Sequence, residues 1–250
     1  MWLLILVDAL KVASTLVCWD KKLSRCGGLD MRELTIHDVH QLFLNRTLTS
    51  KALTKCYIRR IHAMNPELHA VIEVNPDALE IADQLDFYLK TNNKLKGPLH
   101  GIPILVKDNI ATGDKMNTTA GAWALLGAKP SKDAKVIHLL RKSGAIILGK
   151  SNLSEFAGYF SVNAKPGWSG RGGQTVNPYR MKQTPLGSSS GSAVAVAANL
   201  AMVALGTETD GSIVGPATVA SLVGIKPSVG ITSCQGVIPL SPSQDSVILI

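Results

Sequence analysis

Three short segments place polar side chains where the surrounding pattern favours apolar ones. The first ends at Lys107, which closes the apolar run 101–106, Gly-Ile-Pro-Ile-Leu-Val. An apolar run bounded by Gly and Pro predicts a buried strand, so we expect the terminal lysine to be partly buried too. Burial disfavours the charged ammonium and leaves a neutral amine that can act as a base. A strand-end lysine that reaches solvent is the alternative interpretation.

The other two segments are rich in glycine and serine. Residues 187–192 read Gly-Ser-Ser-Ser-Gly-Ser and run directly into an apolar helix predicted to end at Leu200, which disfavours a flexible linker. Residues 206–212 read Gly-Thr-Glu-Thr-Asp-Gly-Ser, and Ser212 opens a further predicted helix. Small residues let the backbone approach a ligand, and a helix N-terminus favours developing negative charge. Ser212 therefore fits either an N-cap or a nucleophile beside oxyanion-stabilising N–H groups.

Taken together, the three segments suit nucleophilic catalysis. A serine hydroxyl is a weak nucleophile until a base removes its proton, and a neutral lysine acting through a second serine can supply that base. The combination predicts covalent catalysis at a serine without a metal or a cofactor.

The motifs resemble the amidase signature family. Residues 187–212 are similar to its pattern G-G-S-S-G-G-S, an alanine-rich helix and G-T-D-T-G-G-S. Residues 101–109 resemble its G-I-P-x-x-V-K-D-N, and residues 224–230 and 236–240 resemble its continuation. The resemblance runs from about residue 36 to Ser246 and keeps several long motifs in order. It implies an α/β fold with a mixed, largely parallel sheet covered by helices.

The resemblance also implies roles for single residues. Ser212 looks like the acylated nucleophile, Ser188 like the bridging serine that the family holds by a cis peptide, and Lys107 like the base. The backbone N–H groups of Thr209, Asp210, Gly211 and Ser212 would form the oxyanion hole. The implied reaction is hydrolysis of a carboxylic amide in a small-molecule substrate, with small or fatty amides expected. A homodimer is compatible with this interpretation.

Several positions depart from the family pattern. Leu186 and Ser190 replace glycines, while Glu208 and Asp210 replace an aspartate and a glycine. Val214 stands where many members have an arginine, which makes substrates with a carboxylate less expected. The three positions implied in catalysis are all kept.

The rest of the chain predicts the elements that position these segments. Two helices are expected over 36–64, with Thr35 and Thr49 as caps, and further helices over 76–90, 132–142, 152–157, 192–200 and 212–222. Strands are expected over 98–106, 145–148 and 202–205. This alternation indicates an α/β fold. We expect an N-terminal extension over 1–34 and the first part of the amidase signature domain over 35–250.

Length and composition restrict the function classes. Family members are about twice as long as these 250 residues, so a truncated chain with apolar surface exposed, and therefore inactive, is one expectation. The formal charge of +8 comes from scattered basic residues and indicates no nucleic-acid partner.

Four cysteines without a Cys-x-x-Cys pair predict neither a metal site nor a disulfide framework. The apolar start, residues 1–7, allows a cytoplasmic or a secretory protein. Asn-x-Ser/Thr sequons begin at Asn45, Asn117 and Asn152.

Three other function classes are compatible with single motifs. Residues 187–191 fit the G-x-S-x-G elbow of α/β-hydrolases, but that fold needs a histidine after the serine and all six histidines precede it. Residues 144–151 fit a phosphate-binding G-x-x-x-x-G-K-S loop, yet their interior Ala-Ile-Ile-Leu is itself strand-like. A glutamine-dependent amidotransferase shares the signature and needs further subunits, and Asp210 and Val214 disfavour it.

Overall fold

The computed structural model of the protein describes residues 25, 26, 28–32 and 34–250. The apolar segment 1–7 lies outside the described residues. Within them, no helix is both long enough and apolar enough to cross a membrane.

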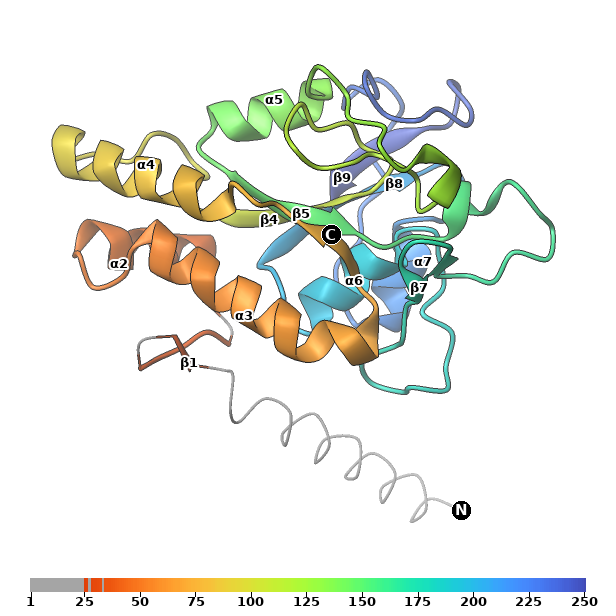
Figure 1. Ribbon diagram of the computed structural model, residues 1–250, viewed down its shortest axis with the longest axis horizontal. Coiled ribbons are helices and arrows are strands. Elements are labelled where there is room, and N and C mark those ends of the chain that lie inside the picture. Colours follow the sequence, from red (N-terminus) through yellow and green to blue (C-terminus); the bar gives the residue numbers. More distant parts are fainter. Residues whose placement is uncertain (1–24, 27, 33) are drawn as a thin grey trace, which may run out of the picture.

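A five-stranded sheet forms the centre of the molecule (Figure 1). Its order is β3 (Val71–Val74), β5 (Ile146–Ser151), β4 (Pro103–Lys107), β8 (Val203–Glu208) and β9 (Ser246–Leu249). The three central strands run parallel, and both edge strands are antiparallel to their neighbours. Every residue of β4 and β5 is buried, as expected for strands that are covered on both faces. The predicted α/β fold with a mixed sheet is confirmed, whereas the two edge strands were not predicted.

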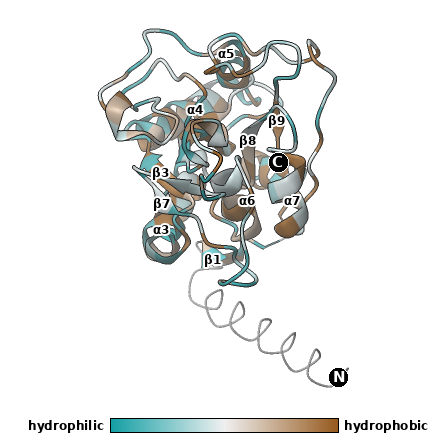
Figure 2. Ribbon diagram, turned by 90° about the vertical axis from the view of Figure 1, so that its right-hand side faces the viewer, coloured by the Kyte–Doolittle hydropathy of each residue, from teal (hydrophilic) through white to brown (hydrophobic). Residues whose placement is uncertain are grey.

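Helices cover both faces of this sheet. In Figures 1 and 2, α4 and α5 lie on one side, and α3, α6 and α7 lie on the other. The helices are α2 (Ile36–Leu44), α3 (Ser50–Leu68), α4 (Ala78–Asn92), α5 (Lys135–Lys142), α6 (Ser190–Ala197) and α7 (Val214–Val219). The short elements are β1 (Arg25–Cys26), β2 (Leu29–Asp30), β6 (Trp168–Ser169), β7 (Gly173–Gln174) and the 3₁₀ turns η1 (Trp123–Leu125) and η2 (Glu155–Gly158).

The first two helices begin where their caps were predicted. The Thr35 side chain accepts a hydrogen bond from the backbone N–H of Asp38, and the Asp38 side chain accepts one from the N–H of Thr35, which completes a capping box. The Thr49 side chain caps α3 by accepting a single hydrogen bond from the N–H of Ala52. These bonds satisfy backbone donors that the helix itself cannot pair.

The helix predicted over 152–157 is wrong. Phe156 and Ala157 have φ angles of 46° and 57°, in the left-handed region, so the chain makes only the turn η2 there. Buried Asn152 instead uses its side chain to link neighbouring segments: its amide nitrogen donates to the carbonyl oxygens of His69 and Gly173. The left-handed backbone at Phe156 and Ala157 therefore prevents a helix here.

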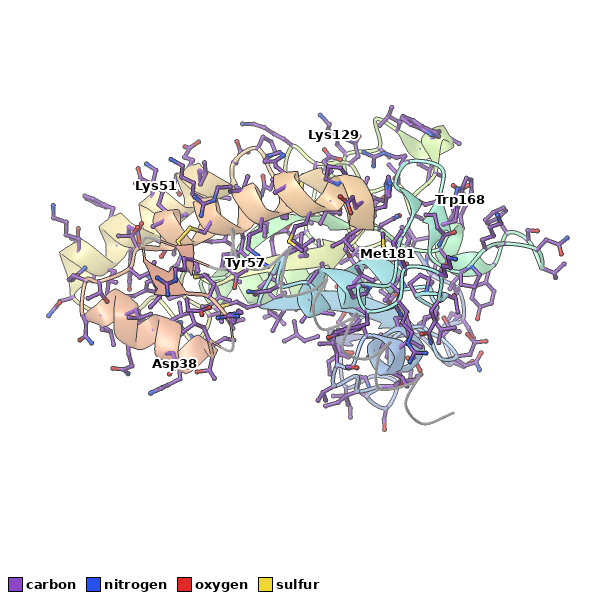
Figure 3. The ribbon with its side chains drawn as sticks, turned by 90° about the horizontal axis from the view of Figure 1, so that it is seen from below. Asp38, Lys51, Tyr57, Lys129, Trp168 and Met181 are labelled. Atoms are coloured by element: carbon purple, nitrogen blue, oxygen red, sulfur yellow. A yellow bond between two sulfur atoms is a disulfide. The ribbon has the colours of Figure 1, made fainter. Side chains whose placement is uncertain are left out.

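The expectation that no cysteines pair is also wrong. Cys26 and Cys56 form a disulfide that joins β1 to α3, shown as a yellow bond in Figure 3. Thirty positions separate the two residues, and no motif marks them as partners. Cys234 is free and half-buried.

Helix α6 packs too tightly for a side chain at its second residue. A Cβ atom at Gly191 would lie 2.5 Å from the backbone nitrogen and oxygen of Asn152, and closer still to the carbonyl oxygen of Ala70. All these neighbours are backbone atoms, which cannot move aside as the end of a flexible side chain can. The N-terminus of α6 is thus held directly against the end of β5.

Substitution of Gly191 by alanine should therefore destabilise the fold. We expect the free energy of unfolding to fall by about 3 kcal/mol because the core must deform to admit the methyl group. The matched control is Gly215→Ala in α7, where the added Cβ would meet only Leu186 at 3.6 Å. This control should be neutral or slightly stabilising, since alanine favours helices. Urea unfolding of both variants measures the difference, and equal stabilities would contradict the packing argument.

Candidate active site

The amine of Lys107 lies at the centre of a buried polar cluster. Its side chain leaves the end of β4 and is fully inaccessible to solvent. The Nζ atom lies 2.7 Å from Oγ of Ser188 and 2.9 Å from Oγ of Ser189. It also donates to the carbonyl oxygen of Thr207 at 3.1 Å. The predicted burial of Lys107 is confirmed, and the solvent-reaching alternative is excluded.

Burial changes the protonation of this lysine. Loss of hydration lowers the pKa of Lys107 from 10.5 to about 7, and the negative charges of Glu208 and Asp245 act in the opposite direction. Three oxygen partners therefore do not restore an ordinary lysine pKa. Near neutral pH a substantial fraction of the amine is unprotonated and can accept a proton.

The two serines beside Lys107 come from the start of α6. The peptide bond between Gly187 and Ser188 is cis. The Ser189 hydroxyl donates to the carbonyl oxygen of Thr207 at 3.1 Å, and it accepts from the N–H of Thr207 at 3.3 Å. Ser189 therefore connects the start of α6 to β8. No role was predicted for Ser189, although it stands in the middle of the serine run.

Ser212 lies in the turn between β8 and α7. Gly211 has a φ angle of 114°, a conformation that residues with a side chain rarely adopt. The Glu208 carboxylate accepts from the backbone N–H groups of Ile213 and Val214 at 2.6 and 2.9 Å. The side chain of Glu208, rather than that of Ser212, thus accepts hydrogen bonds from the backbone N–H groups at the start of α7. The Ser212 hydroxyl is not used as the helix cap.

Ser212 joins the cluster through its backbone. Its carbonyl oxygen accepts from the N–H of Ser189 at 3.0 Å, which places it beside the start of α6. Its hydroxyl makes no hydrogen bond with any described residue. The structure thus brings Lys107 and Ser188 into direct contact. Ser212 is linked through its backbone to Ser189, the residue after Ser188, and is 8% exposed.

The turn before Ser212 offers unused backbone donors. Across the described part of the chain, no hydrogen bond accounts for the N–H groups of Thr209, Asp210, Gly211 or Ser212. Side chains hold the turn instead: the Thr209 hydroxyl donates to Asp245 at 2.6 Å, and the Tyr159 hydroxyl donates to Asp210 at 2.8 Å. Free N–H groups in a fixed turn suit a developing oxyanion.

Sequence reasoning missed the partners of this turn. Tyr159 is half-exposed and comes from the loop after η2, and Asp245 lies just before β9. Neither stands in a motif with the turn, and only the folded chain brings them to it. No signal in the sequence identified them.

A second buried lysine lies on the opposite face of the sheet. Lys150 in β5 donates to the carbonyl oxygen of Ile110 at 2.6 Å and to the Thr118 hydroxyl at 2.9 Å. Burial lowers its pKa to about 8, while nearby Asp108 acts to raise it. A phosphate-binding loop would need this lysine at the end of an open glycine loop. Here it is enclosed within a strand, which agrees with rejecting that motif.

No group of three or more His, Cys, Asp or Glu side chains among the described residues could hold a metal ion. The polar cluster consists of one amine, hydroxyl groups and backbone atoms.

The pKa of Lys107 predicts how stability depends on pH. Below pH 7 the lysine is charged in both the folded and the unfolded chain. Between about 7 and 10.5 only the unfolded chain keeps the proton, so the free energy of unfolding rises with pH. The rise should approach about 1.4 kcal/mol per pH unit.

Urea unfolding across this pH range, compared with Lys107→Met, isolates the effect because all other titrating groups are shared. The wild type should gain stability relative to the variant as pH rises. Parallel curves for the two proteins would show that Lys107 has an ordinary pKa.

Comparison with known proteins identifies the family. The family model described as Amidase matches residues 52–248. A probable amidase from Arabidopsis thaliana is 54% identical over 218 residues, which are 87% of this chain and 43% of that protein. A glutamyl-tRNA(Gln) amidotransferase component from Symbiobacterium thermophilum is 41% identical over 210 residues, which are 84% of this chain and 42% of that protein.

Solved structures agree with this match. The native peptide amidase from Stenotrophomonas maltophilia superposes with a TM-score of 0.84 at 51% identity, covering 87% of this chain and 45% of that chain. An amidase family protein from Bacillus anthracis gives the same TM-score at 38% identity, covering 95% of this chain and 46% of that one. The chain therefore spans less than half the length of these relatives. On its sequence motifs, its fold and these matches, the chain belongs to the amidase family.

Proposed function

We propose that this chain hydrolyses a carboxylic amide bond through an acyl-enzyme on Ser212. The observation that supports the proposal best is the contact between the buried Lys107 amine and the Ser188 hydroxyl at 2.7 Å, combined with the low pKa of that amine. A serine nucleophile requires a base that is unprotonated near neutral pH. Here the base contacts the Ser188 hydroxyl, and the backbone of Ser212 is hydrogen-bonded to the next residue, Ser189.

The hydrogen bonds around Lys107 favour transfer from Ser188. A neutral amine has two N–H groups and one lone pair. The Thr207 carbonyl oxygen can only accept, and the Ser189 hydroxyl already donates to that same carbonyl. Both N–H groups of the neutral amine are thereby used, and its lone pair remains for the hydroxyl proton of Ser188.

The proposed first half-reaction follows from this arrangement. Ser188 gives its proton to Lys107 and takes one from Ser212, whose oxygen attacks the amide carbonyl. The N–H groups of residues 209–212 stabilise the resulting oxyanion. The proton then returns through Ser188 to the leaving amine, and the carbon–nitrogen bond breaks.

The second half-reaction uses water in place of the serine. The same relay removes a proton from water, which attacks the acyl-enzyme ester. The carboxylic acid leaves, Ser212 recovers its proton, and neutral Lys107 is restored. No metal or cofactor enters either half.

The charges around the turn support an uncharged substrate. Glu208, Asp210 and Asp245 are all acidic, and Val214 offers no cation to bind a carboxylate. A substrate with a carboxylate near the scissile amide would be repelled. We propose that the substrate is an uncharged amide. The likeness to a peptide amidase supports an amidated peptide or another amide with an apolar acyl group.

An amidotransferase-type reaction is the second candidate. Curated relatives at 36–41% identity are named as components of glutamyl-tRNA(Gln) amidotransferase. The proposed relay would release ammonia from glutamine equally well. This candidate predicts glutaminase activity, which the acidic turn disfavours because free glutamine has a carboxylate. A homodimer and the domain boundary at residue 35 stay predictions.

Reaction with a fluorophosphonate, a general probe of activated serines, tests the nucleophile. Wild-type protein should gain one adduct by intact mass, and Ser212→Ala should gain none. Lys107→Met and Ser188→Ala should react about 100-fold more slowly or worse, as expected when general base catalysis is lost.

Ser190→Ala is the matched control. Its hydroxyl is buried without a hydrogen-bond partner in the described structure, so the variant should fold and react like wild type. Labelling of Ser212→Ala at the wild-type rate, or a folded wild type that takes up no probe, would contradict the proposal.

The pH dependence of labelling tests the base separately. The rate should rise with pH and level off above about 7, because only unprotonated Lys107 can accept the proton. In Lys107→Met the slow residual reaction should lack this inflection. A wild-type rate still rising steeply above pH 9 would point to a base with an ordinary lysine pKa.

A further inference from the structure

Of the three sequons, Asn152 cannot hold a glycan in the folded chain. Its amide nitrogen is buried and donates to the carbonyl oxygens of His69 and Gly173 and to the Thr175 hydroxyl, at 2.9 to 3.1 Å. Its amide oxygen accepts from the Ser169 hydroxyl at 2.6 Å. A sugar on this nitrogen would break the contacts that hold residues 169–175 against the end of β5.

Asn117 is also engaged. It is half-buried, and its amide nitrogen lies 3.2 and 3.1 Å from the two carboxylate oxygens of Glu73. Its amide oxygen accepts from the N–H of Gly127 at 2.9 Å. Both ends of this side chain are occupied by the fold.

Asn45 differs from both. It is exposed, follows the last residue of α2 and begins the turn to α3, in which Arg46 and Thr47 are exposed too. Its side-chain amide makes no hydrogen bond with any described residue. In Figure 1, α2 lies at the opposite end of the molecule from α7, far from the candidate active site. A large substituent at Asn45 would leave both the fold and the site unobstructed.

The disulfide is a second, independent observation that bears on whether Asn45 is glycosylated. Cys26 and Cys56 pair between β1 and α3, and Cys26 is buried. Such bonds form in oxidising compartments, of which the secretory lumen of eukaryotes also attaches glycans to Asn-x-Ser/Thr. The exposed sequon and the disulfide are thus compatible with the same environment, although they lie in separate parts of the fold.

We propose that Asn45 bears an N-linked glycan and that Asn117 and Asn152 do not. The donor is an oligosaccharide on a lipid diphosphate. The bond between its anomeric carbon and the phosphate oxygen breaks, and that carbon bonds to the amide nitrogen of Asn45. The amide loses one proton, the lipid diphosphate leaves, and the Thr47 hydroxyl completes the recognised triplet.

The test expresses the full chain in eukaryotic cells in two forms, one with its own N-terminus and one behind a cleavable secretion signal. Peptide-N-glycosidase in heavy-oxygen water converts a glycosylated asparagine to labelled aspartate. We expect the label at Asn45 alone in both forms, with Cys26 and Cys56 protected from alkylation until reduction.

Thr47→Ala should abolish the glycan, whereas Thr47→Ser should keep it because serine also completes the triplet. Asn117→Gln should leave the glycan mass unchanged. If only the form behind the added secretion signal carries a glycan, the chain with its own N-terminus does not reach the glycosylating compartment. That result would overturn the proposal for this chain. Absence of the glycan from both forms, or its presence at Asn117 or Asn152 in folded protein, would overturn the assignment of the site.

Discussion

The amine of Lys107 has been taken out of water and given three oxygen partners, from α6 and from β8. Those partners can reach it only because β4 and β8 lie parallel and adjacent and α6 packs across their ends without intervening side chains. The close approach at Gly191 and the double contact of Ser189 with Thr207 follow from the same requirement. Much of the geometry around the sheet can therefore be understood as the enclosure of a single nitrogen atom.

The two buried lysines show how one sheet separates two polar sites. In the register of β4 and β5, Lys107 pairs with Ser151 and Val106 pairs with Lys150. Neighbouring residues of a strand point to opposite faces, so the two amines lie on different sides of the sheet. Lys150 has a carboxylate, Asp108, near it, whereas Lys107 contacts only hydroxyl and carbonyl oxygens. For Lys150 the nearby carboxylate of Asp108 raises the pKa, and for Lys107 Glu208 and Asp245 do so without hydrogen-bonding to the amine.

The sequence predicted those features whose physical cause is local. Thr35 and Thr49 marked helix starts because a cap is read over three residues, and the glycine-serine segments were visible for the same reason. The edge strands were missed because each is only four residues long and pairs far along the chain. The pairing of Cys26 with Cys56, and the contacts of Tyr159 and Asp245 with the turn before Ser212, exist only after folding. At 152–157, the left-handed backbone of Phe156 and Ala157 ended the predicted helix, and no residue type there indicated it.

The separation along the chain between Lys107 and its partners also sets an order of events. Ser188 and Thr207 follow it by 81 and 100 positions, so a growing polypeptide exposes the lysine long before its oxygen partners have been synthesised. Throughout that time it is an ordinary hydrated cation. Its pKa falls only once β8 and the start of α6 enclose it. A nascent chain therefore has Lys107 before it has the hydrogen-bond partners that surround this residue in the fold.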